Sequence, residues 1–174
     1  MSSTYPLAAL SALDQPAFVA ALAGVFEHSP WVAEEAWFQR PFADRQALYG
    51  ALEAVLRKAG RERQLAHIHA HPELAGKAAI RGELTEESAR EQAGAGLNSC
   101  TPAEFGAIRR LNDAYREKFG WPFIVAVKGL TREDIIATMA RRLEGDPDSE
   151  FAEALTQIMK IATFRLADLV TDAA

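Results

Sequence analysis

The chain has 174 residues, a length that suits one domain and leaves little room for two. Its 49% hydrophobic and 25% charged residues are close to the averages for globular domains, which excludes a disordered or fibrous chain. A single cysteine excludes a disulfide framework and a cysteine-based zinc site within one chain. With 19 basic and 24 acidic residues, the net charge of −5 makes a nucleic-acid partner unexpected.

The chain carries no recognisable membrane or targeting signal. No stretch approaches the roughly 18 uninterrupted apolar residues of a membrane-spanning helix. Residues 1–10 lack the basic and apolar parts of a signal peptide, and residues 171–174 do not form a peroxisomal signal. We therefore expect a cytoplasmic protein with no membrane partner.

Apolar residues repeat at helical spacing through the first 70 residues. Asp14, Ser29 and Asp44 each stand where an N-cap is expected before such a stripe. The helix before Pro72 must end, because the residue preceding a proline is pushed out of the α region. The helices expected here cover residues 13–26, 31–38, 45–59 and 61–70.

Three threonines begin later helices. Thr101 opens a capping box with a proline at the first helical position, and Thr85 and Thr131 are further N-caps. The helices expected here cover residues 86–95, 102–119, 132–143 and 147–170. Together these patterns predict an all-α fold, a single-domain bundle of about eight helices over residues 1–174.

The segment 121–129 breaks the helical pattern. Trp121 to Val127 is a short apolar run bounded by glycines, but no second convincing strand exists to pair with it. We expect an extended segment packed among the helices. Its backbone N–H and C=O groups then need partners, either side chains and waters or a polar ligand rich in amide groups.

Three alternating histidines, His67, His69 and His71, form the first chemical feature. On a strand they would share one face and could bind a metal, whereas on a helix the alternation scatters them. Surface or supporting roles are the simpler interpretation for His67 and His69. His71 differs, because it lies at a helix exit before Pro72 and can be held in a cleft for acid–base chemistry.

A second feature lies on the helix after Thr85. Ser88, Glu91 and Gln92 stand at i, i+3 and i+4, so a hydroxyl, a carboxylate and an amide share one face. Such a face can orient a polar heterocycle. From the pattern alone, a solvated helix face is the stronger interpretation.

Arg165 is the third feature. It falls at the edge of the apolar stripe of the last helix, between Ala162 and Leu169. A buried arginine must be paired, either with a carboxylate of the protein or with an anionic ligand. A surface arginine whose stem covers the apolar stripe is the alternative.

These stretches together resemble the OHCU decarboxylase family (2-oxo-4-hydroxy-4-carboxy-5-ureidoimidazoline decarboxylase) of urate degradation. The matching pieces occur in family order over almost the whole chain. They are Ser29-Pro30-Trp31-Val32, His71-Pro72-Glu73-Leu74-Ala75-Gly76-Lys77, Ser88-Ala89-Arg90-Glu91-Gln92, Phe119-Gly120-Trp121-Pro122-Phe123-Ile124, Arg141-Arg142-Leu143 and Arg165-Leu166. Glu73 stands where the family often has aspartate, and Trp121 where it often has phenylalanine or tyrosine.

The resemblance implies a homodimeric enzyme that decarboxylates OHCU to S-allantoin without a cofactor or a metal. It implies that His71 and Glu91 are catalytic. The substrate-binding residues that it implies are Pro72, Ser88, Gln92, Phe123, Ile124, Val127 and Arg165.

Two alternatives remain open at this point. The histidines could belong to a metal-dependent hydrolase of a ureido or amide ring, although a chain of 174 residues is too short for a metal-binding barrel of about 250 residues. The stripe around Arg165 could instead be the exposed groove of a non-catalytic helical interaction module.

Overall fold

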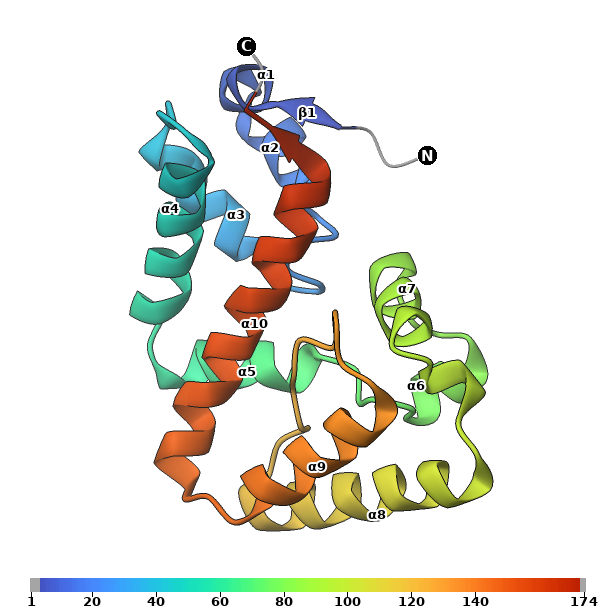
Figure 1. Ribbon diagram of the computed structural model, residues 1–174. Coiled ribbons are helices and arrows are strands. Elements are labelled where there is room, and N and C mark those ends of the chain that lie inside the picture. Colours follow the sequence, from blue (N-terminus) through green and yellow to red (C-terminus); the bar gives the residue numbers. More distant parts are fainter. Residues whose placement is uncertain (1–3, 173–174) are drawn as a thin grey trace. The chain divides into compact units, whose positions relative to one another are not determined.

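The computed structural model describes residues 4–172, without the side chain of Ala78. The terminal residues 1–3 and 173–174, on which part of the targeting prediction depends, lie outside this range. Figure 1 shows a mostly helical chain. Its elements in order are β1 (Tyr5–Pro6), α1 (Leu7–Ala12), α2 (Gln15–Ala21), α3 (Trp31–Ala36), η1 (Trp37–Gln39), α4 (Arg45–Lys58), α5 (Arg61–Ala70), α6 (Lys77–Arg81), α7 (Glu86–Gly94), η2 (Leu97–Ser99), α8 (Pro102–Phe119), α9 (Arg132–Leu143), α10 (Pro147–Leu169) and β2 (Val170–Thr171).

The predicted helical fold is confirmed, with ten α-helices in residues 4–172 against the eight expected. Helices α5, α8 and α9 begin and end where the sequence predicts. Helix α2 ends at Ala21, well before the end of its apolar stripe. No sequence pattern predicts α1, α6 or the parallel pairing of β1 with β2, and each of these elements is six residues or shorter.

Side-chain caps explain why most of the predicted boundaries are correct. Asp14, Asp44 and Thr85 each accept a hydrogen bond from a backbone N–H of the first turn. Thr101 and Thr131 form complete capping boxes with Glu104 and Asp134.

The prediction that Ser29 caps α3 is wrong. Pro30 occupies the N-cap position of α3 and makes no side-chain cap. The Ser29 hydroxyl instead lies 2.6 Å from Nδ1 of His67. The Ser29 hydroxyl therefore contacts the buried His67 ring rather than capping α3, the role that the sequence pattern predicts.

The chain divides into two compact units. One consists of the residues up to Ala70 together with those from Met159 onward, and the other runs from His71 to Ile158. We call them the terminal unit and the central unit and describe each by itself. Helix α10 contributes its first half to the central unit and its second half to the terminal unit.

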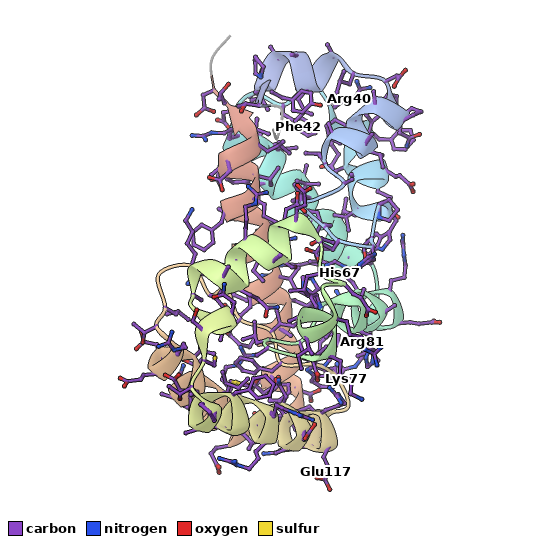
Figure 2. All side chains as sticks on the ribbon, turned by 90° about the vertical axis from the view of Figure 1, so that its right-hand side faces the viewer. Arg40, Phe42, His67, Lys77, Arg81 and Glu117 are labelled. Atoms are coloured by element: carbon purple, nitrogen blue, oxygen red, sulfur yellow. The ribbon has the colours of Figure 1, made fainter. Side chains whose placement is uncertain are left out.

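In the terminal unit, α3 packs against α2 and α4 over a core of fully buried leucine and phenylalanine side chains. Arg40 joins the end of η1 to the end of α1 and to the loop before α2, because its guanidinium donates 2.8 Å hydrogen bonds to the carbonyl oxygens of Ser11 and Leu13. Figure 2 shows Arg40 and Phe42 in the segment that leads into α4.

In the central unit, α8 and α9 lie side by side (Figure 1). Between them and α10, an aromatic cluster is built around Tyr115, whose ring lies 4.5 Å from Phe119 and 5.2 Å from Phe123 between centroids. Polar side chains project outward from α8 at Glu117 and from both ends of α6 at Lys77 and Arg81 (Figure 2). Within residues 4–172, no helix is long and apolar enough to cross a membrane.

Candidate active site

His71 is the first residue after α5 and is buried, with 8% of its surface exposed. The helix ends at Ala70 because His71 precedes Pro72, and the α region is disfavoured before a proline. The predicted position of His71 at a helix exit is therefore confirmed. Its catalytic role stays a prediction.

The loop after His71 has an unusual backbone. Ala75 has a φ of 46°, in the left-handed region that residues with a Cβ seldom adopt. A Cβ at Gly76 would lie 2.8 Å from Cβ of Glu73, so only glycine fits there. Arg116 of α8 forms an ion pair with Glu73 of this loop. These features give the residues after His71 one defined path.

Gln92 of α7 links this loop to the helix that carries Glu91. Its Oε1 accepts a 3.0 Å hydrogen bond from the N–H of Ala75, and its Nε2 donates a 3.3 Å hydrogen bond to the carbonyl of Glu73. The loop and the helix face predicted to act together are thus joined by direct hydrogen bonds.

The polar face of α7 is not a solvated surface. Ser88 and Gln92 are buried, at 5% and 7% exposure, and Glu91 is half-buried. The hydroxyl and the amide of this face are therefore buried, which removes the solvated-face interpretation for Ser88 and Gln92. Which of these groups contacts a substrate stays a prediction.

The segment from Trp121 to Val127 is extended, buried and without strand pairing, as the sequence predicts. Two side chains satisfy part of its backbone. Arg142 donates a 2.6 Å hydrogen bond to the carbonyl of Ile124, and the N–H of Ala126 donates to Oε1 of Gln157 at 3.0 Å. Phe123, Ile124 and Val127, the predicted substrate-binding positions, all lie in this buried run.

A buried ionic network supports this segment, and sequence reasoning missed it. The Arg142 Nε lies 2.9 Å from Oε2 of Glu150, and the Tyr115 hydroxyl donates to the same oxygen at 2.7 Å. Burial and the Glu150 contact raise the pKa of Tyr115 well above its ordinary value. The guanidinium also stacks on the ring of Phe123, 4.5 Å from its centroid. One arginine thus holds both the backbone and a side chain of the extended segment.

A signal for Arg142 and Asn112 was present in the sequence. Arg142 follows the buried Ile135 and Met139 at helical spacing, and Asn112 interrupts the buried stripe of α8 in the same way. A polar residue at helical spacing within an apolar stripe is the same sign that marks Arg165, and it marks Arg142 and Asn112 as well.

Arg165 belongs to the terminal unit and is paired, as predicted for a buried arginine. Its Nη1 lies 3.1 Å from Oε1 of Glu27 and donates a 2.9 Å hydrogen bond to the carbonyl of Gly24. The two side chains are only 7% and 2% exposed. The partner is therefore a protein carboxylate, and sequence reasoning did not identify Glu27, which lies outside any helix or obvious motif.

His67 lies in the same unit, between Ser29 and the rings of Phe26 and Trp31. Burial lowers the pKa of His67 from 6.5 to about 4, and the carboxylate of Glu27 opposes this shift. His67 is therefore a neutral buried residue near neutral pH.

The structure bears on both alternative functions. His69 is exposed while His67 is buried, and no group of three or more His, Cys, Asp or Glu side chains in residues 4–172 is arranged to hold a metal ion. The stripe around Arg165 is buried at Ala162 and Leu166, whereas the interaction-module alternative requires an exposed groove.

The fold and the site together define a mostly helical protein with a buried histidine loop joined to a polar helix face. The family model described as OHCU decarboxylase matches residues 11–167. The chain is 42% identical over 156 residues to a 2-oxo-4-hydroxy-4-carboxy-5-ureidoimidazoline decarboxylase of Haloferax volcanii, covering 90% of each chain. The chain therefore belongs to the OHCU decarboxylase family.

Two further similarities agree with this assignment. The chain is 39% identical to the uric acid degradation bifunctional protein PucL of Bacillus subtilis over 94% of its own length and 32% of that protein. Its structure is similar to a crystal structure of (S)-allantoin synthase, with a TM-score of 0.75 and 28% identity. That match covers 95% of this chain and 54% of the other, so the chain spans about half of that protein.

Proposed function

We propose that this protein decarboxylates OHCU to S-allantoin in the degradation of urate. The proposal rests on its family membership and, within the structure, on the two hydrogen bonds through which Gln92 joins the His71 loop to the helix of Glu91. The substrate is a small polar anion, and the protein acts on it with its own side chains.

The chemistry explains why a side-chain pocket suffices. The bond between the ring carbon and the carboxylate breaks, CO₂ leaves, and the electron pair enters the neighbouring imidazolone system. The neighbouring ring carbon, which carries the ureido group, then takes a proton. The hydroxyl on the carbon that lost CO₂ gives up its proton and becomes the carbonyl of the product. A pocket that stabilises the redistributed charge accelerates the first step, and a proton delivered to one face only gives a single enantiomer.

Each site residue has a role in this scheme. His71 handles the proton, and Glu91 acts with it by hydrogen-bonding the hydroxyl and orienting the scissile carboxylate. Ser88, Gln92 and Pro72 bind the substrate together with the buried backbone around Phe123, Ile124 and Val127. Arg165, held by Glu27, binds the anionic part of the substrate.

We further propose a homodimer of single-domain chains that works in the cytoplasm. These proposals rest on the family resemblance and on the sequence. Light scattering of the purified protein measures the mass in solution. A mass of one chain at assay concentration contradicts the dimer.

The catalytic assignment is tested by His71→Asn, with His69→Asn as the matched control on an exposed histidine. OHCU decays without a catalyst, so its loss is measured beside a reaction without protein. We expect His71→Asn to lose most of the acceleration and His69→Asn to keep it. A His71→Asn protein that accelerates decay as the wild type does contradicts the role of His71.

A further inference from the structure

Two buried side-chain amides from different helices form hydrogen bonds with the backbone of the loop that follows His71. Gln92 of α7 bonds the carbonyl of Glu73 and the N–H of Ala75, at 3.3 and 3.0 Å. Asn112 of α8 donates a 2.9 Å hydrogen bond to the carbonyl of Leu74, which lies between them in the chain. Three consecutive loop residues are therefore held from outside the loop.

Asn112 is an unexpected residue at its position. It is 4% exposed and lies in the apolar stripe of α8 between Ile108 and Tyr115. A buried amide is costly unless it is hydrogen-bonded, and its Oδ1 has no hydrogen-bond partner within residues 4–172. An apolar side chain would fill the stripe without this cost. What the amide adds, and an apolar side chain lacks, is the hydrogen bond that Asn112 donates to the carbonyl of Leu74.

Support from outside matters for this loop because its backbone adopts a strained conformation, and its own backbone hydrogen bond, from the N–H of Gly76 to the carbonyl of Glu73, is 3.3 Å long. Ala75 lies in the left-handed region, and the approach of Glu73 to Gly76 leaves no space for a Cβ. Conformations of this kind persist when surrounding groups hold them. Gln92 and Asn112 supply those groups from two helices of the same unit.

We propose that Asn112 and Gln92 are positioning residues that clamp residues 73–75 and so set the place of His71 relative to Glu91. This inference rests on the proposed function. It gives Asn112 a role in the reaction that its sequence position does not reveal. It also gives Gln92 a second task, performed through the loop, beside its proposed contact with the substrate.

The main test is Asn112→Asp, which removes the donor to Leu74 and places a carboxylate oxygen opposite a carbonyl. Asn98→Asp, the same change on an exposed asparagine, is the matched control. We expect kcat of Asn112→Asp to fall about 10- to 100-fold, since small misplacements of a catalytic group cost this much. KM should stay within about threefold of the wild type, because the substrate contacts are kept. The enantiomeric excess of S-allantoin should also fall.

The alternatives give different results. A folded Asn112→Asp protein with wild-type kcat, or with a raised KM and unchanged kcat, overturns the inference. Should that variant not fold, Gln92→Glu decides, because it keeps the acceptor for Ala75 and loses the donor to Glu73. The inference predicts a lower kcat for it, and a change confined to KM overturns the clamp.

Hydrogen exchange tests the clamp without any substrate. The N–H of Ala75 should be protected in the wild type and exchange much faster in Gln92→Met, which removes its acceptor at similar volume. Equal protection in both proteins overturns the clamp. A wild-type protein that does not accelerate OHCU decay contradicts the proposed function instead, so the two failures are distinguishable.

Discussion

Two buried arginines, Arg142 in the central unit and Arg165 in the terminal unit, invite comparison. Each lies on the apolar stripe of its helix, pairs with a buried glutamate, and donates to a backbone carbonyl. By exposure they are nearly equal, at 6% and 7% for the side chain. Their surroundings differ far more than their burial does.

Arg142 shares Glu150 with the Tyr115 hydroxyl and holds the carbonyl of Ile124, so its role is to support the extended segment. Arg165 pairs with Glu27 beside the titratable His67. Burial and pairing alone therefore do not separate a supporting arginine from a substrate-binding one. Family resemblance separates them here, and the following experiments test that separation.

The largest expected effect is on stability at the Arg142 pair. Glu150→Ala leaves the Arg142 charge buried without its carboxylate and removes the acceptor of Tyr115. Loss of one partner of a buried ion pair costs about 3–5 kcal/mol. Urea unfolding should show a fall of this size in the free energy of unfolding, with a smaller fall for Glu27→Ala. A loss below about 1 kcal/mol for Glu150→Ala contradicts the structural role of this pair.

The second expected effect is on the pH dependence of the free energy of unfolding, and it arises from His67 in the terminal unit. The pKa of His67 is about 4 in the folded protein and 6.5 unfolded, so the unfolded chain binds more protons between these values. The stability contributed by neutral His67 is therefore present above pH 6.5 and is lost as the pH falls toward 4. The loss is about 3 kcal/mol over this range.

Unfolding free energies of the wild type and His67→Asn at pH 7 and pH 4 measure that loss. The variant should show a smaller drop than the wild type, while the exposed control His69→Asn should follow the wild type. Parallel pH profiles for all three proteins would show that the pKa of His67 is the same in the folded and unfolded states, which contradicts the lowered pKa.

The third effect concerns substrate affinity. Arg165→Lys keeps a positive charge but loses the planar fork that suits an anionic substrate. We expect KM for OHCU to rise about 10-fold or more, a binding loss of about 1.4 kcal/mol. Arg141→Lys, on an exposed neighbour of Arg142, is the control. A wild-type KM for Arg165→Lys removes the substrate role of Arg165 and makes it a supporting residue like Arg142.

The smallest expected loss of stability is at an exposed ion pair, which serves as the reference for the buried pairs. Arg57 and Glu53 form an exposed ion pair at i, i+4 on α4. Exposed pairs of this kind contribute about 0.3–0.5 kcal/mol. Glu53→Ala should therefore leave the urea midpoint almost unchanged. A loss comparable to that of Glu150→Ala would mean that burial does not explain the stability of the buried pairs.

Much of the fold could be predicted because its signals are local. Capping residues such as Thr101 and Thr131 act on the next turn of the chain, so sequence shows them directly. The missed elements depend on distant partners. Strand β1 forms only because Val170 and Thr171 lie beside Tyr5 and Pro6. The failure of Ser29 to cap α3 has the same cause, because the partner of its hydroxyl, His67, is 38 residues away in the chain.

The site residues likewise fall into those that local sequence signals predict and those that depend on contacts with distant parts of the chain. The exit of His71 from its helix follows from Pro72, and the shared face of Ser88 and Gln92 follows from helical spacing. Glu27 and Asn112 both act through contacts with residues far along the chain, and spacing does not reveal which residues those are. A polar residue within an apolar stripe is the one local sign of such contacts, and it marks Asn112, Arg142 and Arg165 alike.

The proposed decarboxylation is tested most directly by following the optical activity of the product. OHCU is generated in situ from urate with the two preceding enzymes, and circular dichroism records allantoin with and without this protein. The account predicts that optically active S-allantoin forms faster when the protein is present, and that racemic product dominates when it is absent. Equal rates and no optical activity in both reactions would contradict the proposed function.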